Sequence, residues 1–159
     1  KGSITLVLTK NVSRFEFLLC KFIAGVIILT GLLLVSILFG AFYTNRLFDG
    51  FIYDGFIESM LIFWLMGVFY ISLGIFVSTI GKTPTTSALF GFFGFAVLQV
   101  LNVSSKLATF NPAGASSITN QILASTFDLS TLLISVLVTL LSTILLFILS
   151  LIIFKKQEI

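Results

Sequence analysis

Four long stretches of the chain carry no charged residue, and they constrain the fold more than any other feature of the sequence. They cover residues 22–45, 59–81, 83–105 and 129–154. A charge at the centre of a bilayer costs about 2.5 to 3.5 kcal/mol, and a helix needs about 20 apolar residues to cross the hydrocarbon region. All four stretches are long enough, so the sequence predicts an all-α, polytopic helical membrane protein with four transmembrane helices.

The composition supports this fold class and argues against several functions. Hydrophobic residues make up 58% of the chain and charged residues only 9%, whereas about 25% of the residues of a soluble domain are charged. No basic cluster is interleaved with aromatic residues, so we expect no nucleic-acid partner. The chain has one cysteine and no histidine, which excludes an internal disulfide and a Cys/His metal site.

The polar regions between the stretches predict the orientation in the membrane. Alternate regions fall into two groups, which hold seven and two of the nine basic residues. The larger group consists of Lys1, Lys10, Arg14, Lys21, Lys82, Lys155 and Lys156. Since regions rich in Lys and Arg stay in the cytoplasm, we expect a multi-pass protein of the cell membrane with both termini of this chain and the Lys82 turn in the cytoplasm.

Local signals predict where the helices begin. Ser13 and Glu16 have the spacing of a capping box, in which the two side chains satisfy each other's backbone amides. Thr83 followed by Pro84 is typical of an N-cap with proline at the first helical position. We therefore expect a single transmembrane domain over residues 1–159, with spans at about 15–44, 57–80, 84–105 and 129–154.

Residues 106–128 differ from the rest of the chain. They have little charge but many Ser, Thr and Asn residues, and they include the turn sequence of residues 111–114. Ile118 and Ile122 have the spacing of one helix face. We interpret the region as an external loop with a short interfacial or re-entrant helix. A fifth complete span is the alternative, and the cost of its polar groups in lipid argues against it.

The tripeptide Gly81-Lys82-Thr83 resembles the end of a nucleotide-binding P-loop. That motif requires a glycine at the position that Phe76 occupies here, so we interpret the tripeptide as a cytoplasmic turn. No acid, base or histidine lies inside the four uncharged stretches of the spans, which argues against a proton-coupled carrier and an intramembrane protease. We expect no catalytic residue, no metal site and no cofactor bound by this chain, and hence no enzyme.

Uncharged polar residues inside the spans are the candidates for contact with a transported substrate. Gln99 is the only strongly polar side chain deep in a span, and the last span carries hydroxyl groups at spacings of three to four residues. These are Thr131, Ser135, Thr139, Ser142 and Thr143. Polar groups at such spacing commonly hold helices together in lipid. We therefore favour helix packing for Gln99, Ser135, Thr139 and Ser142, and keep a translocation path as the alternative.

The segment ahead of the first span is the most specific feature. A short apolar stretch at residues 4–8 is followed by a polar break and then by the capped helix. Such an element in the cytoplasm presents apolar side chains beside a span. It predicts either a docking surface for a partner protein or a helix on the lipid surface.

This segment and two shorter ones resemble a known family. The pattern consists of Gly2, Leu6, Leu8, Val12, Ser13, Arg14, Glu16, Phe17, Leu18, Leu19 and Lys21. It is similar to the cytoplasmic segment between the second and third spans of the permease subunits of type 2 ABC transporters, the export class. The turn at residues 78–86 and the ending at residues 153–158 also look like that family. Thr5, Asn11 and Cys20 depart from the pattern, where an acidic residue, Pro and Gly are usual.

The resemblance implies a function and partners. The chain would be the membrane-spanning permease subunit of an ATP-driven exporter, and a separate ABC ATPase subunit would bind the ATP. Two permeases, identical or different, would enclose the translocation path in the lipid bilayer. Residues 1–14, here called the coupling segment, would dock on the ATPase. The docking residues are Gly2, Ile4, Leu6, Leu8, Ser13, Arg14 and Glu16. The family's first two spans have no counterpart, which implies an N-terminally incomplete permease.

Two other functions remain open from the sequence. A non-transporting integral membrane scaffold or assembly protein would have the same spans. A small channel is a further alternative, although the spans lack the polar or charged ring of a pore lining.

Overall fold

A computed structural model describes residues 13–47, 55–104, 108, 110–114, 118–119, 122 and 128–156. Its elements in this part of the chain are α2 (Arg14–Leu47), α3 (Phe56–Ile80), α4 (Pro84–Leu101), the short 3-10 helix η1 (Pro112–Gly114) and α7 (Leu129–Lys156). All four long helices have the length and apolar composition needed to cross a membrane. The predicted all-α, polytopic fold with four transmembrane helices is therefore confirmed.

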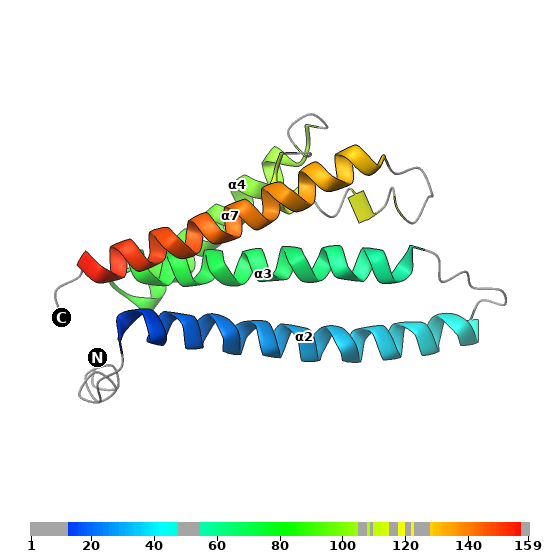
Figure 1. The fold of residues 1–159 in the computed structure, drawn as a ribbon, viewed down its shortest axis with the longest axis horizontal. Helices are drawn as coiled ribbons and strands as arrows, with labels where there is room; N and C mark the ends of the chain where they lie inside the picture. The colour runs from blue at the N-terminus through cyan, green and yellow to red at the C-terminus, as the bar shows by residue number, and fades with distance from the viewer. Residues whose placement is uncertain are drawn as a thin grey trace.

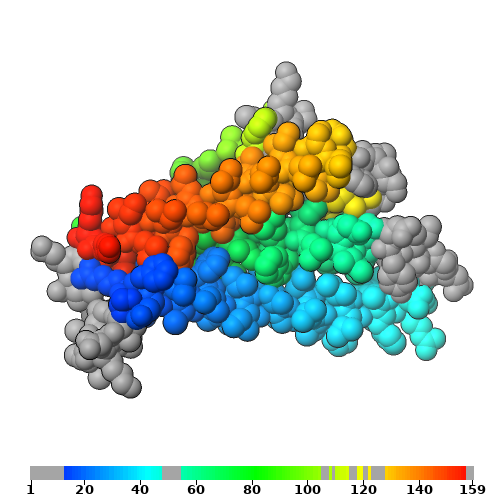
Figure 2. Space-filling model, viewed as in Figure 1, coloured from blue at the N-terminus to red at the C-terminus, as the bar shows by residue number. Residues whose placement is uncertain are grey.

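The central helix of the bundle is α3. It contacts α2, α4, α7 and η1, and its contact with α7 is the most extensive. Figure 1 shows α3 between α2 and α7, and in Figure 2 it is visible as a strip between them. In the most apolar stretch of α3, 33% of the residues are buried, compared with 0% in α2 and in α4. The outer helices thus expose most of their apolar surface, which suits an environment of lipid tails.

Consecutive long helices run in opposite directions, so their ends gather in two groups (Figure 1). The start of α2, the turn between α3 and α4, and the end of α7 lie together, and we call this the basic end. Its described basic residues are Arg14, Lys21, Lys82, Lys155 and Lys156. Arg46 lies in the last turn of α2, at the opposite end. The predicted grouping of basic residues therefore corresponds to one end of the folded bundle.

Small hydroxyl residues lie buried along the helices that pack most closely. On α7 they are Ser135, Thr139, Thr143 and Ser150, and on α3 they are Ser59, Ser72 and Thr79. Thr139 Oγ1 donates to the Ser135 carbonyl at 2.8 Å, and Thr143 Oγ1 donates to the Thr139 carbonyl at 2.7 Å. The Thr139 and Thr143 hydroxyls are thus satisfied within their own helix, and small side chains at these positions allow α3 and α7 to approach closely.

The helix α4 ends at Leu101, before the predicted limit at residue 105. Its 18 residues give a length of about 27 Å at about 1.5 Å per residue, slightly less than a hydrocarbon core of about 30 Å. The last carbonyl groups of a helix have no partners within the helix, and leaving them unpaired in the hydrocarbon region is costly. Asn111 reduces this cost, because its Nδ2 donates to the Leu98 carbonyl at 2.7 Å.

A second asparagine joins this contact to η1. Asn111 Nδ2 also donates to Asn102 Oδ1 at 2.7 Å, and Asn102 Nδ2 donates to the Ala113 carbonyl at 2.8 Å. The Ala113 amide in turn donates to Asn111 Oδ1 at 3.1 Å. Gly114 is required beside this network, because a Cβ there would overlap the carbonyl oxygen of Ala108. We call Asn102, Asn111 and the η1 backbone the asparagine network.

The described part of the predicted external loop packs against the bundle. η1 contacts α3, α4 and α7. Ile118 and Ile122 are only 3% and 4% exposed, and with Ile62 of α3 they form a hydrophobic cluster. Met66 and Leu132 pack against this cluster. Apart from residues 118–119 and 122, the stretch at 115–127 in which the short interfacial helix is predicted lies outside the described residues.

Candidate functional site

The predicted docking residues fall in two parts of the chain. Gly2, Ile4, Leu6 and Leu8 lie outside the described residues, whereas Ser13, Arg14 and Glu16 are described. The capping box is present: the Glu16 amide donates to Ser13 Oγ at 3.2 Å, and the Ser13 amide donates to Glu16 Oε2 at 2.8 Å. These two bonds fix the direction in which the chain enters α2.

Arg14 joins the first turn of α2 to the last turn of α7. Its Nη1 donates to the Phe154 carbonyl at 3.0 Å and to the Lys155 carbonyl at 2.9 Å. The last carbonyls of a helix lack partners within the helix and carry the negative end of its dipole, so a guanidinium group is well placed there. Sequence analysis assigned Arg14 to partner docking and did not predict this contact.

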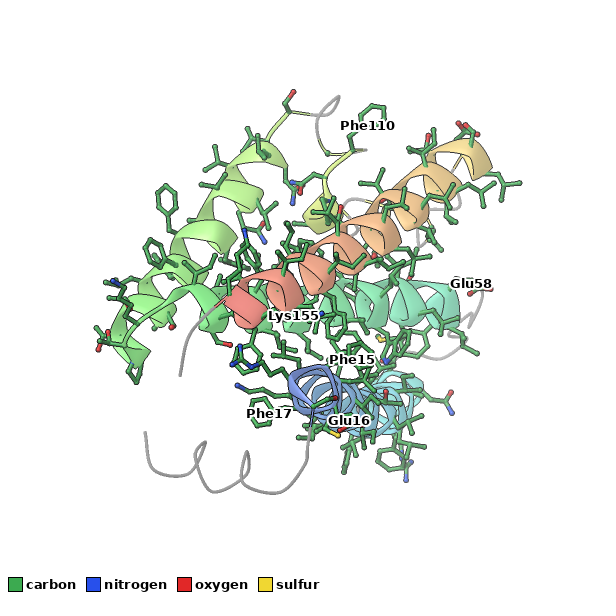
Figure 3. The ribbon with its side chains drawn as sticks, turned by 60° about the vertical axis from the view of Figure 1, so that its left-hand side comes forward. Phe15, Glu16, Phe17, Glu58, Phe110 and Lys155 are labelled. Carbon is green, nitrogen blue, oxygen red and sulfur yellow. The ribbon has the colours of Figure 1, made fainter. Side chains whose placement is uncertain are left out.

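Aromatic rings extend the same junction into the bundle. Phe17 and Phe154 stack with ring centroids 6.1 Å apart, and Phe22 and Phe147 lie 5.3 Å apart. Between them Leu18 is only 2% exposed. Figure 3 shows Glu16 and Phe17 at the start of α2 and Lys155 at the end of α7, at the same end of the bundle. The first turns of α2 are therefore anchored on α7.

The Lys82 turn has the features of a helix connection. Lys82 is exposed between α3 and α4. Thr83 is the predicted N-cap of α4, with Pro84 at the first helical position, and Thr83 and Thr86 form a second capping box. A P-loop places its lysine between a strand and a helix, whereas both neighbours of this turn are apolar helices. The geometry is that of a tight turn.

An apolar groove of about 490 Å³ opens between α3, α4 and α7, with Pro112 of η1 at its wall. The other lining residues are Phe69, Leu73, Gly94, Val97, Leu98, Leu141, Ser142, Leu145 and Leu146. Ser142 contributes the only hydroxyl group among these side chains, and none of them is charged. The groove suits an apolar chain or ring better than an ion.

The structure separates the four residues that sequence analysis grouped inside the spans. Ser142 lines the groove, while Ser135 and Thr139 are buried, at 3% and 1% exposure. Gln99 lies on the surface of α4, and its Nε2 donates to the Tyr70 hydroxyl of α3 at 3.4 Å. In this arrangement Gln99 links two helices, Ser135 and Thr139 lie in the packed interior, and Ser142 lies at the wall of the groove.

Two further groups of residues were missed by sequence analysis. Asn102 and Asn111 form the asparagine network, for which the sequence offers only the Asn-Pro turn pattern at 111. Trp64 Nε1 donates to Thr30 Oγ1 at 2.9 Å and so joins α3 to α2. The sequence does not predict that Asn102 meets Asn111 or that Trp64 meets Thr30, because these partners are uncharged and lie on different elements.

Asp128 marks the start of α7. The hydroxyl and amide of Ser130 donate to its carboxylate, and Thr131 Oγ1 donates at 3.2 Å. These hydrogen bonds lower the pKa of Asp128 below its usual value, because they stabilise the charged carboxylate. A negative charge at this position also suits the positive end of the α7 dipole.

A comparison with protein families accounts for the whole chain. The model of the family described as "ABC-2 family transporter protein" matches residues 1–159. The chain belongs to this family. It is therefore a multi-pass membrane permease component of an ABC transporter, a transport component and not a classical enzyme. Comparison with curated proteins and with solved structures gives no match.

Membership of the ABC-2 family identifies the class of partner. Membrane subunits of this family generally work with ABC ATPase subunits.

Proposed function

We propose that the protein is the membrane-spanning subunit of an ATP-driven exporter, docked on a separate ATPase subunit that binds and hydrolyses the ATP. The chain itself binds no cofactor in this proposal. The observation that carries the proposal is the family match over residues 1–159, which extends through the coupling segment as well as the four spans.

The geometry of the basic end supports docking at the coupling segment. The capping box fixes the backbone at Ser13, so a force on residues 1–12 acts directly on the first turn of α2. Apolar side chains such as Ile4, Leu6 and Leu8 provide the kind of surface that packs into a groove on a partner. In this proposal these side chains contact the ATPase. The protein lies in the plasma membrane, with both termini of this chain in the cytoplasm.

The translocation path in this proposal is shared between two permeases, identical or different. The most apolar stretches of α2 and α4 have no buried residue, so each helix has a large face available to a second permease or to lipid. The groove at Ser142 then contributes to a path for an apolar or amphipathic substrate.

Purification of the protein with its partner tests the proposal. We expect an affinity-tagged protein, extracted from its native membrane in mild detergent, to bring an ABC ATPase subunit with it and to show ATP hydrolysis. A Lys82→Ala variant should retain that hydrolysis, because Lys82 lies in a turn and holds no nucleotide. Co-purification of no ATPase would contradict the exporter, and so would hydrolysis that depends on Lys82.

Accessibility labelling tests the proposed orientation. Cys20 is the single cysteine, so a Cys20→Ser background allows one new cysteine at position 54 or position 82. We expect a membrane-impermeant maleimide to label position 54 in intact cells and position 82 only after permeabilisation, because basic regions stay in the cytoplasm. The reverse pattern would invert the orientation.

A further inference from the structure

Arg14 lies where the coupling segment, α2 and α7 meet. It is the first residue of α2 and follows the capped Ser13. Its side chain is half-buried and holds the two carbonyls of Phe154 and Lys155. Any displacement of the chain at Ser13 therefore acts, within one residue, on a group bonded to α7.

The contact between α2 and α7 is localised at this end. α2 contacts α3 more extensively than it contacts α7, and Leu18 is its one buried residue among those described. The stacked rings of Phe17 and Phe154 lie next to the Arg14 bonds. Arg14, Phe17 and Phe154 thus form one contact region between the start of α2 and the end of α7, which we call the joint.

Beyond this joint, α7 borders both the packed interior and the groove. Its buried residues are small hydroxyl residues, including Ser135, Thr139 and Ser150. Small side chains interlock less than large ones do, and packed helices can shift against each other by about 1 to 2 Å in switching proteins. The same helix contributes Leu141, Ser142, Leu145 and Leu146 to the groove. A shift of α7 therefore changes the shape of the groove.

We propose that Arg14 is a positioning residue that transmits movement of the coupling segment to α7, and through α7 to the groove at Ser142. This inference rests on the proposed function, since the ATPase supplies the movement. It assigns Arg14 to a contact within the permease, whereas sequence analysis placed it on the partner surface. The planar guanidinium holds two neighbouring carbonyls with one nitrogen, and the flexible ammonium of a lysine reproduces this only in part.

The test measures an ATP-dependent movement in the purified complex. Spin labels at positions 82 and 156, in the Cys20→Ser background, report the distance between the α3–α4 turn and the end of α7. Both positions are exposed. We expect a non-hydrolysable ATP analogue to shift this distance in the parent complex. The Arg14→Gln variant should retain the ATPase subunit. Its population at the shifted distance should be about tenfold smaller than in the parent complex, the factor expected for the loss of a hydrogen bond to a charged group.

Matched variants separate this role from a general effect of charge. Lys21→Gln removes the same charge from an exposed position on the same helix and should keep the shift, while Arg14→Lys should restore part of it. If Arg14→Gln retains both the ATPase and the full shift, the inference fails and the exporter proposal stands. A parent complex that shows no shift also overturns the inference. If the parent protein binds no ATPase, the proposed function fails and the role of Arg14 fails with it.

Discussion

Replacing Leu6 by glutamate is expected to release the ATPase subunit from the complex. In the proposed exporter Leu6 is one of the apolar residues of the coupling segment that pack against the ATPase. Removal of such a side chain from water is worth about 1.5 to 3 kcal/mol, and a buried charge adds a further cost. Since about 1.4 kcal/mol corresponds to a tenfold change in affinity, we expect docking to weaken at least about tenfold. The measurement is the amount of ATPase that co-purifies with the tagged permease.

The control for this experiment is a charge at the other end of the bundle. Asn45 is exposed in the last turns of α2, so Asn45→Glu adds the same charge away from the basic end. We expect this variant to retain the ATPase and its activity. If Leu6→Glu retains the partner as well as Asn45→Glu does, residues 1–14 are not the coupling segment.

The second large effect is expected at Asn111. This side chain is 4% exposed and takes part in three hydrogen bonds, with Leu98, Asn102 and Ala113. In an Asn111→Ala variant the Leu98 carbonyl and the Ala113 amide lose these partners. A buried polar group without a partner costs about 1 to 3 kcal/mol. We expect the melting temperature of the purified protein in detergent to fall by about 5 to 10 °C.

An isosteric variant tests whether the hydrogen-bond donor is what matters. Asn111→Asp keeps the shape but replaces the donating amide by an oxygen, which faces the oxygens of Leu98 and Asn102. It should destabilise the protein at least as much as Asn111→Ala does. Asn45→Ala makes the same truncation at an exposed site and should leave the melting temperature unchanged. A stable Asn111→Asp variant would show that the asparagine network does not hold η1 in place.

The sequence was sufficient for the features that depend on local physics. A span needs only length, apolar composition and the absence of charge, so the four helices could be predicted from four uncharged stretches. The starts of α2 and α4 could also be predicted, because a cap is formed by residues three positions apart, as in the pair Ser13 and Glu16. The same motif, read together with the apolar stretch before it, was enough to suggest the ABC-2 family.

Only the tertiary structure decided which distant groups meet. The end of α4 was predicted too late because Asn102 carries no charge, and the groups that let the helix stop, Asn111 and the η1 backbone, come from a later segment. Arg14 could be assigned to a surface but not to the end of α7, 140 residues away. Ser142 lies about two turns after Ser135, on nearly the same face of α7, and only the packing of the neighbouring elements decides that Ser142 lines the groove while Ser135 is buried. In a bilayer nearly every span residue is apolar, so hydropathy locates the helices but does not indicate which of their faces pack together.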